Sequence, residues 1–262
     1  MNNIIDLLMQ PEMAIPIYIF VTILGIMFGS FLNVLIYRIP KKEEFVKTSS
    51  HCMSCNHKLA WYDNIPLFSW LILGGKCRYC KEKISIQYPI IEAINGLLWL
   101  AIFIINGISI SSILICAMTS GLLALSVIDW RTYEIANGFH LYFIAIALAN
   151  IALDYTNWLN YLIGFFCVSI PLLAIYLFSG GRAIGGGDVK LMAACGLILG
   201  WQNILLALVV GCVVGSIIHI ARMKITKTGH LLAMGPYLAI GVVTASLFGQ
   251  QIISWYLSLF FY

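Results

Sequence analysis

Long stretches without a single charged residue constrain this chain more than any other feature. They cover residues 14–36, 108–128, 158–178, 191–218 and 231–262. A helix of about 20 apolar residues is enough to cross a bilayer. Apolar residues make up 61% of the 262 positions and charged residues only 10%, which departs strongly from the composition of water-soluble domains. The chain is therefore predicted to be an all-α polytopic membrane protein.

Dividing these runs predicts about eight membrane-spanning helices. The sequence Gly200-Trp201-Gln202-Asn203 favours a turn that splits one run into a short helix over 188–200 and a second over 203–221. Segments 88–106 and 138–153 add two further spans, and a final helix is expected from Leu231 onward. Gly249-Gln250-Gln251 could interrupt that last helix, so the sequence leaves open whether it is one helix or two.

Lysine and arginine set the orientation, because basic loops stay on the cytoplasmic side. Threading eight spans places all of them on one side, with nine in the segment 37–87. The charges assigned to the other side are Asp6, Glu12 and Asp154. The amino terminus is thus expected outside, and no basic stretch marks the first helix as a cleavable signal. The net charge of +4 reflects this loop bias, and no nucleic-acid partner is expected.

The chain is expected to have three parts. Residues 1–36 form a first transmembrane helix, 37–87 a cytoplasmic four-cysteine loop domain, and 88–262 a membrane bundle. The loop contains two Cys-x-x-Cys pairs, Cys52 with Cys55 and Cys77 with Cys80. Each pair can present two thiolates to one ion, and together they match a tetrahedral zinc site. Disulfides are disfavoured by the cytoplasmic assignment, and a redox role remains the other alternative.

Two aspartates, Asp129 and Asp188, lie at the ends of apolar runs, and the second follows Gly185-Gly186-Gly187. A carboxylate beside hydrocarbon loses hydration energy, so it usually has a partner or a function. Taken singly, each has a structural explanation: Asp188 as a helix N-cap, and Asp129 in an ion pair with Arg131.

Taken together, the two acids favour chemistry. The topology places Asp129 and Asp188 at the same cytoplasmic boundary, and Gly185 and Gly187 would let a substrate backbone approach closely. Two carboxylates held close together in a low dielectric share one proton, as in aspartic proteases. Lys190, at the start of the helix that Asp188 begins, is a further interfacial charge near the site, although such a residue is more often structural.

Ordered motifs along the chain resemble those of the type IV prepilin peptidases, which belong to the Gly-x-Gly-Asp class of membrane aspartyl proteases. The resemblance covers nearly the whole chain. It rests on Gly29–Pro40, the two cysteine pairs, Trp61–Trp70, Gly75–Arg78, Tyr88–Glu92, Gly187–Leu191 and Gly235–Ala239.

The resemblance implies a bifunctional enzyme. Asp129 and Asp188 would form the catalytic dyad that removes the leader of type IV prepilins or pseudopilins in the bacterial inner membrane, serving pili or protein secretion. Cys52, Cys55, Cys77 and Cys80 would bind a structural zinc ion. Methylation of the new amino terminus by S-adenosylmethionine is implied as well, with its site unassigned.

The chain departs from the family pattern in one place near the site. Members often have Pro-Asp eight residues after the first catalytic aspartate, where this chain has Ala136-Asn137. This leaves Asp129 as the acid of that segment and argues against a three-acid site. The proline usual inside the first cysteine pair is also missing.

Two other classes of function fit parts of the sequence. A membrane cation transporter would use the two acids as an ion pathway and the four cysteines as a metal sensor. Acids of a pathway are expected near mid-bilayer on broken helices of repeated halves, which the sequence does not show. A membrane thiol oxidoreductase would depend on the cysteines and be indifferent to both aspartates.

Overall fold

The computed structural model describes residues 11–44, 50–226 and 232–259. Asp6 lies outside the described residues, as do Lys47 and Lys227 among the basic residues that set the predicted orientation. The described chain is helical apart from turns and two isolated β-bridges in the cysteine loop. It divides into two compact units, Met1–Ser112 and Ile113–Tyr262.

The first unit is built on two long helices, α2 (Pro11–Lys41) and α4 (Gln87–Asn106), which pack against each other. A Cβ at Gly29 would lie 2.7 Å from the Cα of Glu92, so glycine is what lets the two backbones approach at this point. The buried Asn95 side chain donates to the carbonyl of Gly25 at 2.7 Å. A polar bond across the pair thus fixes its register where apolar contacts alone would not.

The cysteine loop connects these two helices and contains two short helical segments, η1 (Trp61–Asn64) and α3 (Phe68–Ile72). Helix α2 continues to Lys41, beyond the predicted end at residue 36, and so includes the polar residues that follow the apolar run. The loop therefore starts a full turn later than the hydropathy pattern alone suggests.

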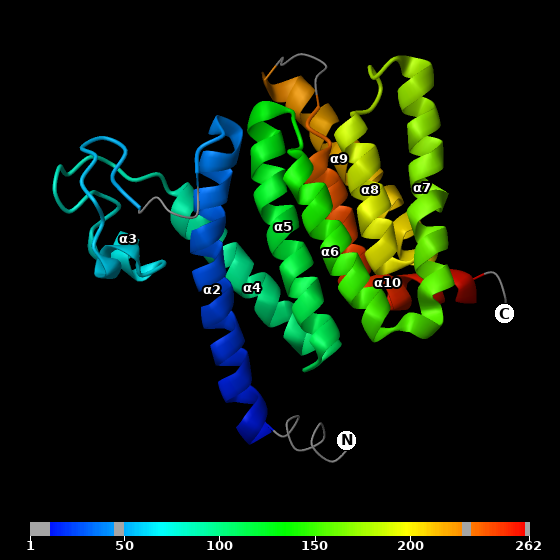
Figure 1. Cartoon of the computed structure of the whole chain (residues 1–262), viewed down its shortest axis with the longest axis horizontal. Coiled ribbons are helices and arrows are strands. Elements are labelled where there is room, and N and C mark those ends of the chain that lie inside the picture. Colours follow the sequence, from blue (N-terminus) through cyan, green and yellow to red (C-terminus); the bar gives the residue numbers. More distant parts are fainter. Residues whose placement is uncertain (1–10, 45–49, 227–231, 260–262) are drawn as a thin grey trace. The chain divides into compact units, whose positions relative to one another are not determined.

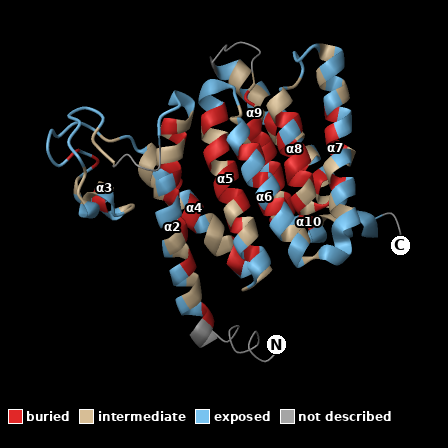
Figure 2. Cartoon of the chain, viewed as in Figure 1, coloured by how far each residue is buried: buried red, intermediate tan, exposed pale blue. Residues whose placement is uncertain are grey.

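The second unit is a helical bundle around α8 (Figure 1). Its elements, with α5 beginning just before the unit boundary, are α5 (Ile110–Thr132), α6 (Asn137–Leu153), η2 (Tyr155–Asn157), α7 (Trp158–Ser179), α8 (Gly186–Leu199), α9 (Trp201–Thr226) and α10 (Gly235–Ser258). Helix α8 contacts α6, α7, α9 and α10. Figure 2 shows buried residues along most of α8, which is therefore the core of this unit.

Two glycines bring α7 and α8 into close backbone contact. A Cβ at Gly196 would lie 2.2 Å from the carbonyl oxygen of Gly164, and a Cβ at Gly164 would lie 2.4 Å from the carbonyl oxygen of Gly196. Small residues at such crossings are a common way to pack helices in a membrane. Any side chain at either position would push the central helix away from α7.

All eight predicted segments are helical, and six of the helices are long and apolar enough to cross a membrane: α2 from Ala14, α4, α5, α7 with η2, α9 and α10. Helices α6 and α8 are shorter, with 17 and 14 residues. The predicted turn is confirmed at Gly200, whose φ of +77° ends α8, but α9 resumes at once at Trp201 and continues to Thr226.

The last helix is single, because α10 runs through Gly249-Gln250-Gln251 without a break. Its predicted start at Leu231 lies outside the described residues, and α10 begins at Gly235. The two glutamines do not end it, since a helix satisfies its own backbone hydrogen bonds whatever side chains it carries.

Candidate active site and metal centre

The two sequence-predicted aspartates line one pocket of the second unit. Asp129 lies in the last turn of α5 and Asp188 in the first turn of α8, and they border a pocket of about 280 Å³. Their exposed fractions are only 4% and 7%. The sequence separates these residues widely, and the bundle brings them together.

Asp188 is positioned by the glycine cluster before it. Gly185 is the N-cap residue of α8, so the structural explanation of Asp188 as the N-cap itself is wrong, and Asp188 occupies the third helical position. Its Oδ2 accepts a hydrogen bond from the Gly185 N–H at 3.3 Å, while its own N–H donates to the Gly185 carbonyl at 3.1 Å. The first bond is one half of a capping box; the second is a backbone turn bond, because glycine has no side chain to complete the box. The helix start therefore fixes the carboxylate.

Asp129 is held by a residue from another helix. The N–H of Gly235, the first residue of α10, donates to Asp129 Oδ2 at 2.9 Å. A Cβ at position 235 would lie 2.7 Å from the same oxygen. Gly235 belongs to one of the motifs that carry the family resemblance, and no role was predicted for it. A glycine in a motif can indicate that another group comes close to the backbone, but only the tertiary structure shows that this group is Asp129.

The glycines of the cluster also form the pocket wall. Gly185 and Gly187 both line it, and a Cβ at Gly187 would lie 3.0 Å from the Cβ of Ile135. Lys190, in contrast, is exposed on α8 and does not line the pocket. Glu134 lines it from an exposed position. This third carboxylate was not among the site residues predicted from the sequence.

The two cysteine pairs of the first unit adopt the same local structure. An antiparallel bridge closes each turn, joining His51 with Lys58 and Lys76 with Lys83. The residue after each pair, Asn56 or Lys81, has a positive φ of 54° or 63°. Each backbone thus curls around its two thiols. This repeated turn is the knuckle expected of a structural metal site.

The four sulfur atoms of Cys52, Cys55, Cys77 and Cys80 all lie within 4.8 Å of one another, so the cluster could hold a metal ion. All four cysteines are free. The sulfurs of Cys52 and Cys80 are 3.7 Å apart, too far for a disulfide. Zinc–sulfur bonds of about 2.3 Å at tetrahedral angles place two ligands about 3.8 Å apart. The donor set and its spacing therefore fit zinc.

Hydrogen bonding favours the thiolate form of Cys52, which is the form that binds a metal ion. Backbone N–H groups of Cys55 and then Ser54 bond the Cys52 sulfur and lower the pKa of its thiol to about 6. Donors to a thiolate stabilise the charged form. The pKa of the neighbouring Cys80 thiol is instead raised to about 12, so of these two residues Cys52 is the one that ionises more readily.

Comparison with known proteins extends over most of the chain. Residues 23–105 match the bacterial Peptidase A24 N-terminal domain, and residues 116–220 match the Type IV leader peptidase family. Curated relatives named prepilin leader peptidase/N-methyltransferase include that of Stutzerimonas stutzeri, 34% identical over 90% of this chain and 92% of the relative. The proteins of Pseudomonas aeruginosa (31%; 90% and 91%) and Pseudomonas putida (29%; 94% and 94%) carry the same name. No solved structure matches the chain.

Proposed function

Because the chain belongs to the type IV leader peptidase family, we propose that it removes the leader of type IV prepilins or pseudopilins and methylates the new amino terminus. The observation that best supports the peptidase activity is that two buried carboxylates, Asp129 and Asp188, border one pocket. The relatives are named for both activities.

The proposed cleavage uses the two acids as an aspartic dyad. One carboxylate is ionised and takes a proton from a water molecule as the water attacks the scissile carbonyl carbon. The protonated partner donates to the carbonyl oxygen, and the resulting tetrahedral intermediate passes a proton to the leaving nitrogen as the C–N bond breaks. No covalent enzyme intermediate forms. The products are the leader carboxylate and a free amino terminus.

Glycines in the pocket wall leave room for a substrate to approach the two aspartates. Gly185 and Gly187 leave the wall of the pocket without side chains, so an extended substrate backbone could lie against α8 next to Asp188. The N–H of Gly235 holds Asp129 from the opposite element. Substrate and water would then meet two carboxylates whose positions are fixed before binding.

The proposed topology has eight membrane spans, with the amino terminus outside and both the cysteine loop and the dyad at the cytoplasmic face. Six long apolar helices support it, and α6 and α8 would be the two short spans. We retain the three-part division into 1–36, 37–87 and 88–262. A dyad at the inner boundary would meet the prepilin where its basic leader ends and its apolar helix begins, without exposing backbone groups deep in lipid.

Two small partners complete the proposal. Zinc would be held by Cys52, Cys55, Cys77 and Cys80 and would fold the loop, since a loop of this kind has little core of its own. S-adenosylmethionine would supply the methyl group. Metal content of the purified protein and of a Cys52→Ser, Cys77→Ser double variant tests the first. One zinc per chain that disappears in the double variant is expected, and unchanged zinc would reject the four-thiolate site.

The peptidase proposal is tested with Asp129→Asn and Asp188→Asn, which keep the shape of the side chain but remove its acid–base chemistry. Initial rates of leader removal from a co-expressed prepilin should fall by a factor of about 10² to 10⁴ in each variant. Asp154→Asn, which changes a half-buried carboxylate that does not line the pocket, is the matched control and should cleave normally. Cleavage at the normal rate in either dyad variant would remove the assignment.

The same variants separate the two competing functions. A cation transporter predicts metal flux in proteoliposomes that depends on Asp188. A thiol oxidoreductase predicts activity that disappears with a single cysteine and is indifferent to both aspartates. No observation among the described residues specifically favours either class. The two acids border a pocket, as a peptidase site requires, and the four thiols form one cluster that could hold a structural metal ion.

A further inference from the structure

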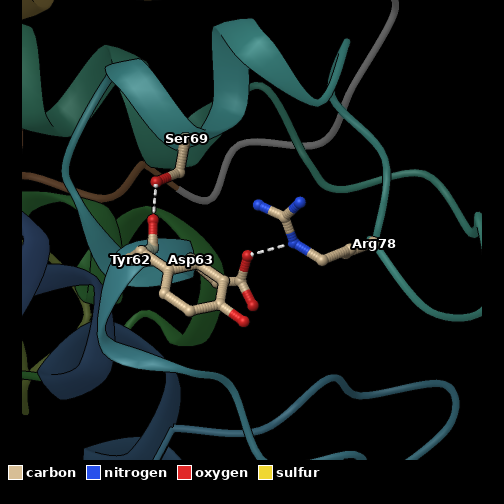
Figure 3. Close-up of polar contacts among 4 residues, drawn as sticks. All are labelled: Tyr62, Asp63, Ser69 and Arg78. Atoms are coloured by element: carbon tan, nitrogen blue, oxygen red, sulfur yellow. Dashed lines mark hydrogen bonds and ion pairs between the residues drawn. The ribbon is translucent and has the colours of Figure 1, made fainter.

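An arginine stacked on an aromatic ring can hold two segments of a chain together. In the cysteine loop, Arg78 lies over Tyr62, with its Cζ 5.2 Å from the ring centroid. Its Nε also donates to Asp63 at 2.7 Å, which Figure 3 shows beside the bond from Ser69 to the Tyr62 carbonyl. These contacts join residues of one loop, so they account for the local structure of that loop.

A second stack joins two helices of the other unit. Arg222, near the end of α9, lies over the ring of Trp130, near the end of α5, with its Cζ 4.8 Å from the ring centroid. A guanidinium within about 6 Å of a tryptophan centroid is attracted to the face of the ring. Trp130 directly follows Asp129. The stack therefore connects α9 to the turn of α5 that carries one acid of the dyad.

The backbone is strained immediately after this turn. Tyr133 follows the last residue of α5 and has a φ of +56°, in the left-handed region that glycine normally occupies at a helix end. Its N–H donates to the carbonyl of Asp129 at 2.8 Å, and it lines the dyad pocket. Strain of this kind persists only where surrounding contacts enforce it. The turn that carries Asp129 therefore depends on contacts from other elements.

Helices α9 and α10 form a rigid support for these contacts, because their backbones approach closely. A Cβ at Gly241 of α10 would lie 2.0 Å from the carbonyl oxygen of Ala207 of α9. A Cβ at Gly215 of α9 would lie 3.3 Å from the Cβ and Cγ of Tyr237, a residue of α10 that is buried. Contacts this close leave the two helices little freedom to slide against each other.

This pair of helices holds α5 at two consecutive residues. Gly235 of α10 donates its N–H to Asp129, and Arg222 of α9 lies over Trp130. We propose that Arg222, acting through Trp130, is a positioning residue that fixes Asp129 for leader cleavage. The inference rests on the proposed peptidase function. It gives a role to two residues that the mechanism above does not use.

The effect is expected in kcat and not in KM. Neither Arg222 nor Trp130 is among the described residues that line the dyad pocket, so neither is placed to bind the substrate there. Removing an interaction that only orients a catalytic group slows the chemical step and leaves ground-state binding unchanged. Between a partly exposed and a desolvated stack, the expected decrease in kcat is about 3- to 30-fold.

The experiment measures leader cleavage by the full chain in lipid nanodiscs over a range of prepilin concentrations, which separates kcat from KM. Arg222→Gln removes the cation and Trp130→Leu removes the aromatic face, and each should lower kcat about 3- to 30-fold with KM within about twofold. Arg222→Lys and Trp130→Phe keep a cation and a ring, so their kcat should stay within about twofold of the wild type. Lys224→Gln is the matched control, because it removes an exposed cation two residues further along α9, and it should cleave normally.

A double variant shows whether the two residues act as one pair. Once one partner is absent, loss of the other should have little further effect, so Arg222→Gln with Trp130→Leu should be within about twofold of the slower single variant. Hydrogen exchange of peptides from 126–134 should be faster in each single variant, while exchange in α7 stays unchanged. That measurement reports the end of α5 directly and does not depend on turnover.

The outcomes decide the inference. Wild-type kcat in Arg222→Gln or Trp130→Leu, an increase in KM in place of the decrease in kcat, or multiplied losses in the double variant would overturn it. If one single variant does not fold, the other breaks the same stack and provides the test. If neither folds, the stack serves the fold and the positioning role is wrong.

Asp129→Asn in the same assay separates this inference from the proposed function. If Asp129→Asn cleaves normally, the dyad assignment fails and the positioning role fails with it. If Asp129→Asn is inactive while Arg222→Gln and Trp130→Leu are fully active, the dyad stands and only the positioning role is lost.

Discussion

Replacing Gly235 by alanine is expected to impair leader cleavage without harming the fold. The φ of Gly235 is not positive, so alanine can adopt the backbone conformation, and at the start of α10 it is the better helix former. The added Cβ, however, would lie 2.7 Å from Asp129 Oδ2 and 3.1 Å from its Cγ. Contacts this short require a shift, so the carboxylate must move away from the N–H that now holds it at 2.9 Å.

The size of the effect follows from that hydrogen bond. A hydrogen bond to a charged group contributes about 1.5 to 3 kcal/mol, and each 1.36 kcal/mol of lost transition-state stabilisation lowers the rate tenfold. The expected decrease in the rate of leader removal is therefore about 10- to 150-fold. This range reaches only the lower end of the loss expected for Asp129→Asn, because the acid remains present but displaced.

The assay is the initial rate of prepilin processing by purified protein, measured with the thermal unfolding midpoint of the same sample. Gly138→Ala is the matched control, since a Cβ there would meet nothing within 4 Å; it should cleave within about twofold of the wild type. The reasoning is refuted if Gly235→Ala also cleaves within twofold. A parallel loss of thermal stability would instead mean that the glycine serves the fold.

Three further results are expected. Gly196→Ala, whose Cβ would lie 2.2 Å from the Gly164 carbonyl oxygen, should lower the unfolding midpoint by about 2 to 12 °C, from about 1 to 3 kcal/mol of overpacking at 2 to 4 °C per kcal/mol; a midpoint equal to that of Gly138→Ala would contradict the close helix contact. Removing zinc with a chelator should speed hydrogen exchange in 50–83 while α8 stays protected, because the four thiols that would hold the ion cluster within that segment; exchange unchanged by chelation would count against a structural metal. Glu134→Gln should retain leader cleavage within about threefold, since two acids suffice for the dyad, and a hundredfold loss would establish a third catalytic acid.

Much of the fold could be predicted because a membrane restricts what an apolar segment can form. Hydropathy predicted the eight helices, and the turn at Gly200 followed from local sequence, since only the residues around it decide a helix end. The lengths were less accurate. Helix α2 continues through its polar end to Lys41, and hydropathy does not report where helical hydrogen bonding stops.

The sequence could suggest only those candidate site residues whose type and position are unusual. Asp129 and Asp188 were proposed from their position beside apolar runs, and the four cysteines from their spacing. The bond from Gly235 to Asp129 joins residues 106 positions apart, and the contact of Leu67 with Glu92 joins two elements. Neither leaves a local pattern.

Because the cysteine cluster and the dyad pocket each lie within a single compact unit, damage to one is expected to leave the other whole. Asp188→Asn should therefore keep the zinc content of the wild type, and the Cys52→Ser, Cys77→Ser double variant should keep the buried dyad. A merodiploid that carries both alleles should then process prepilin through the second allele alone.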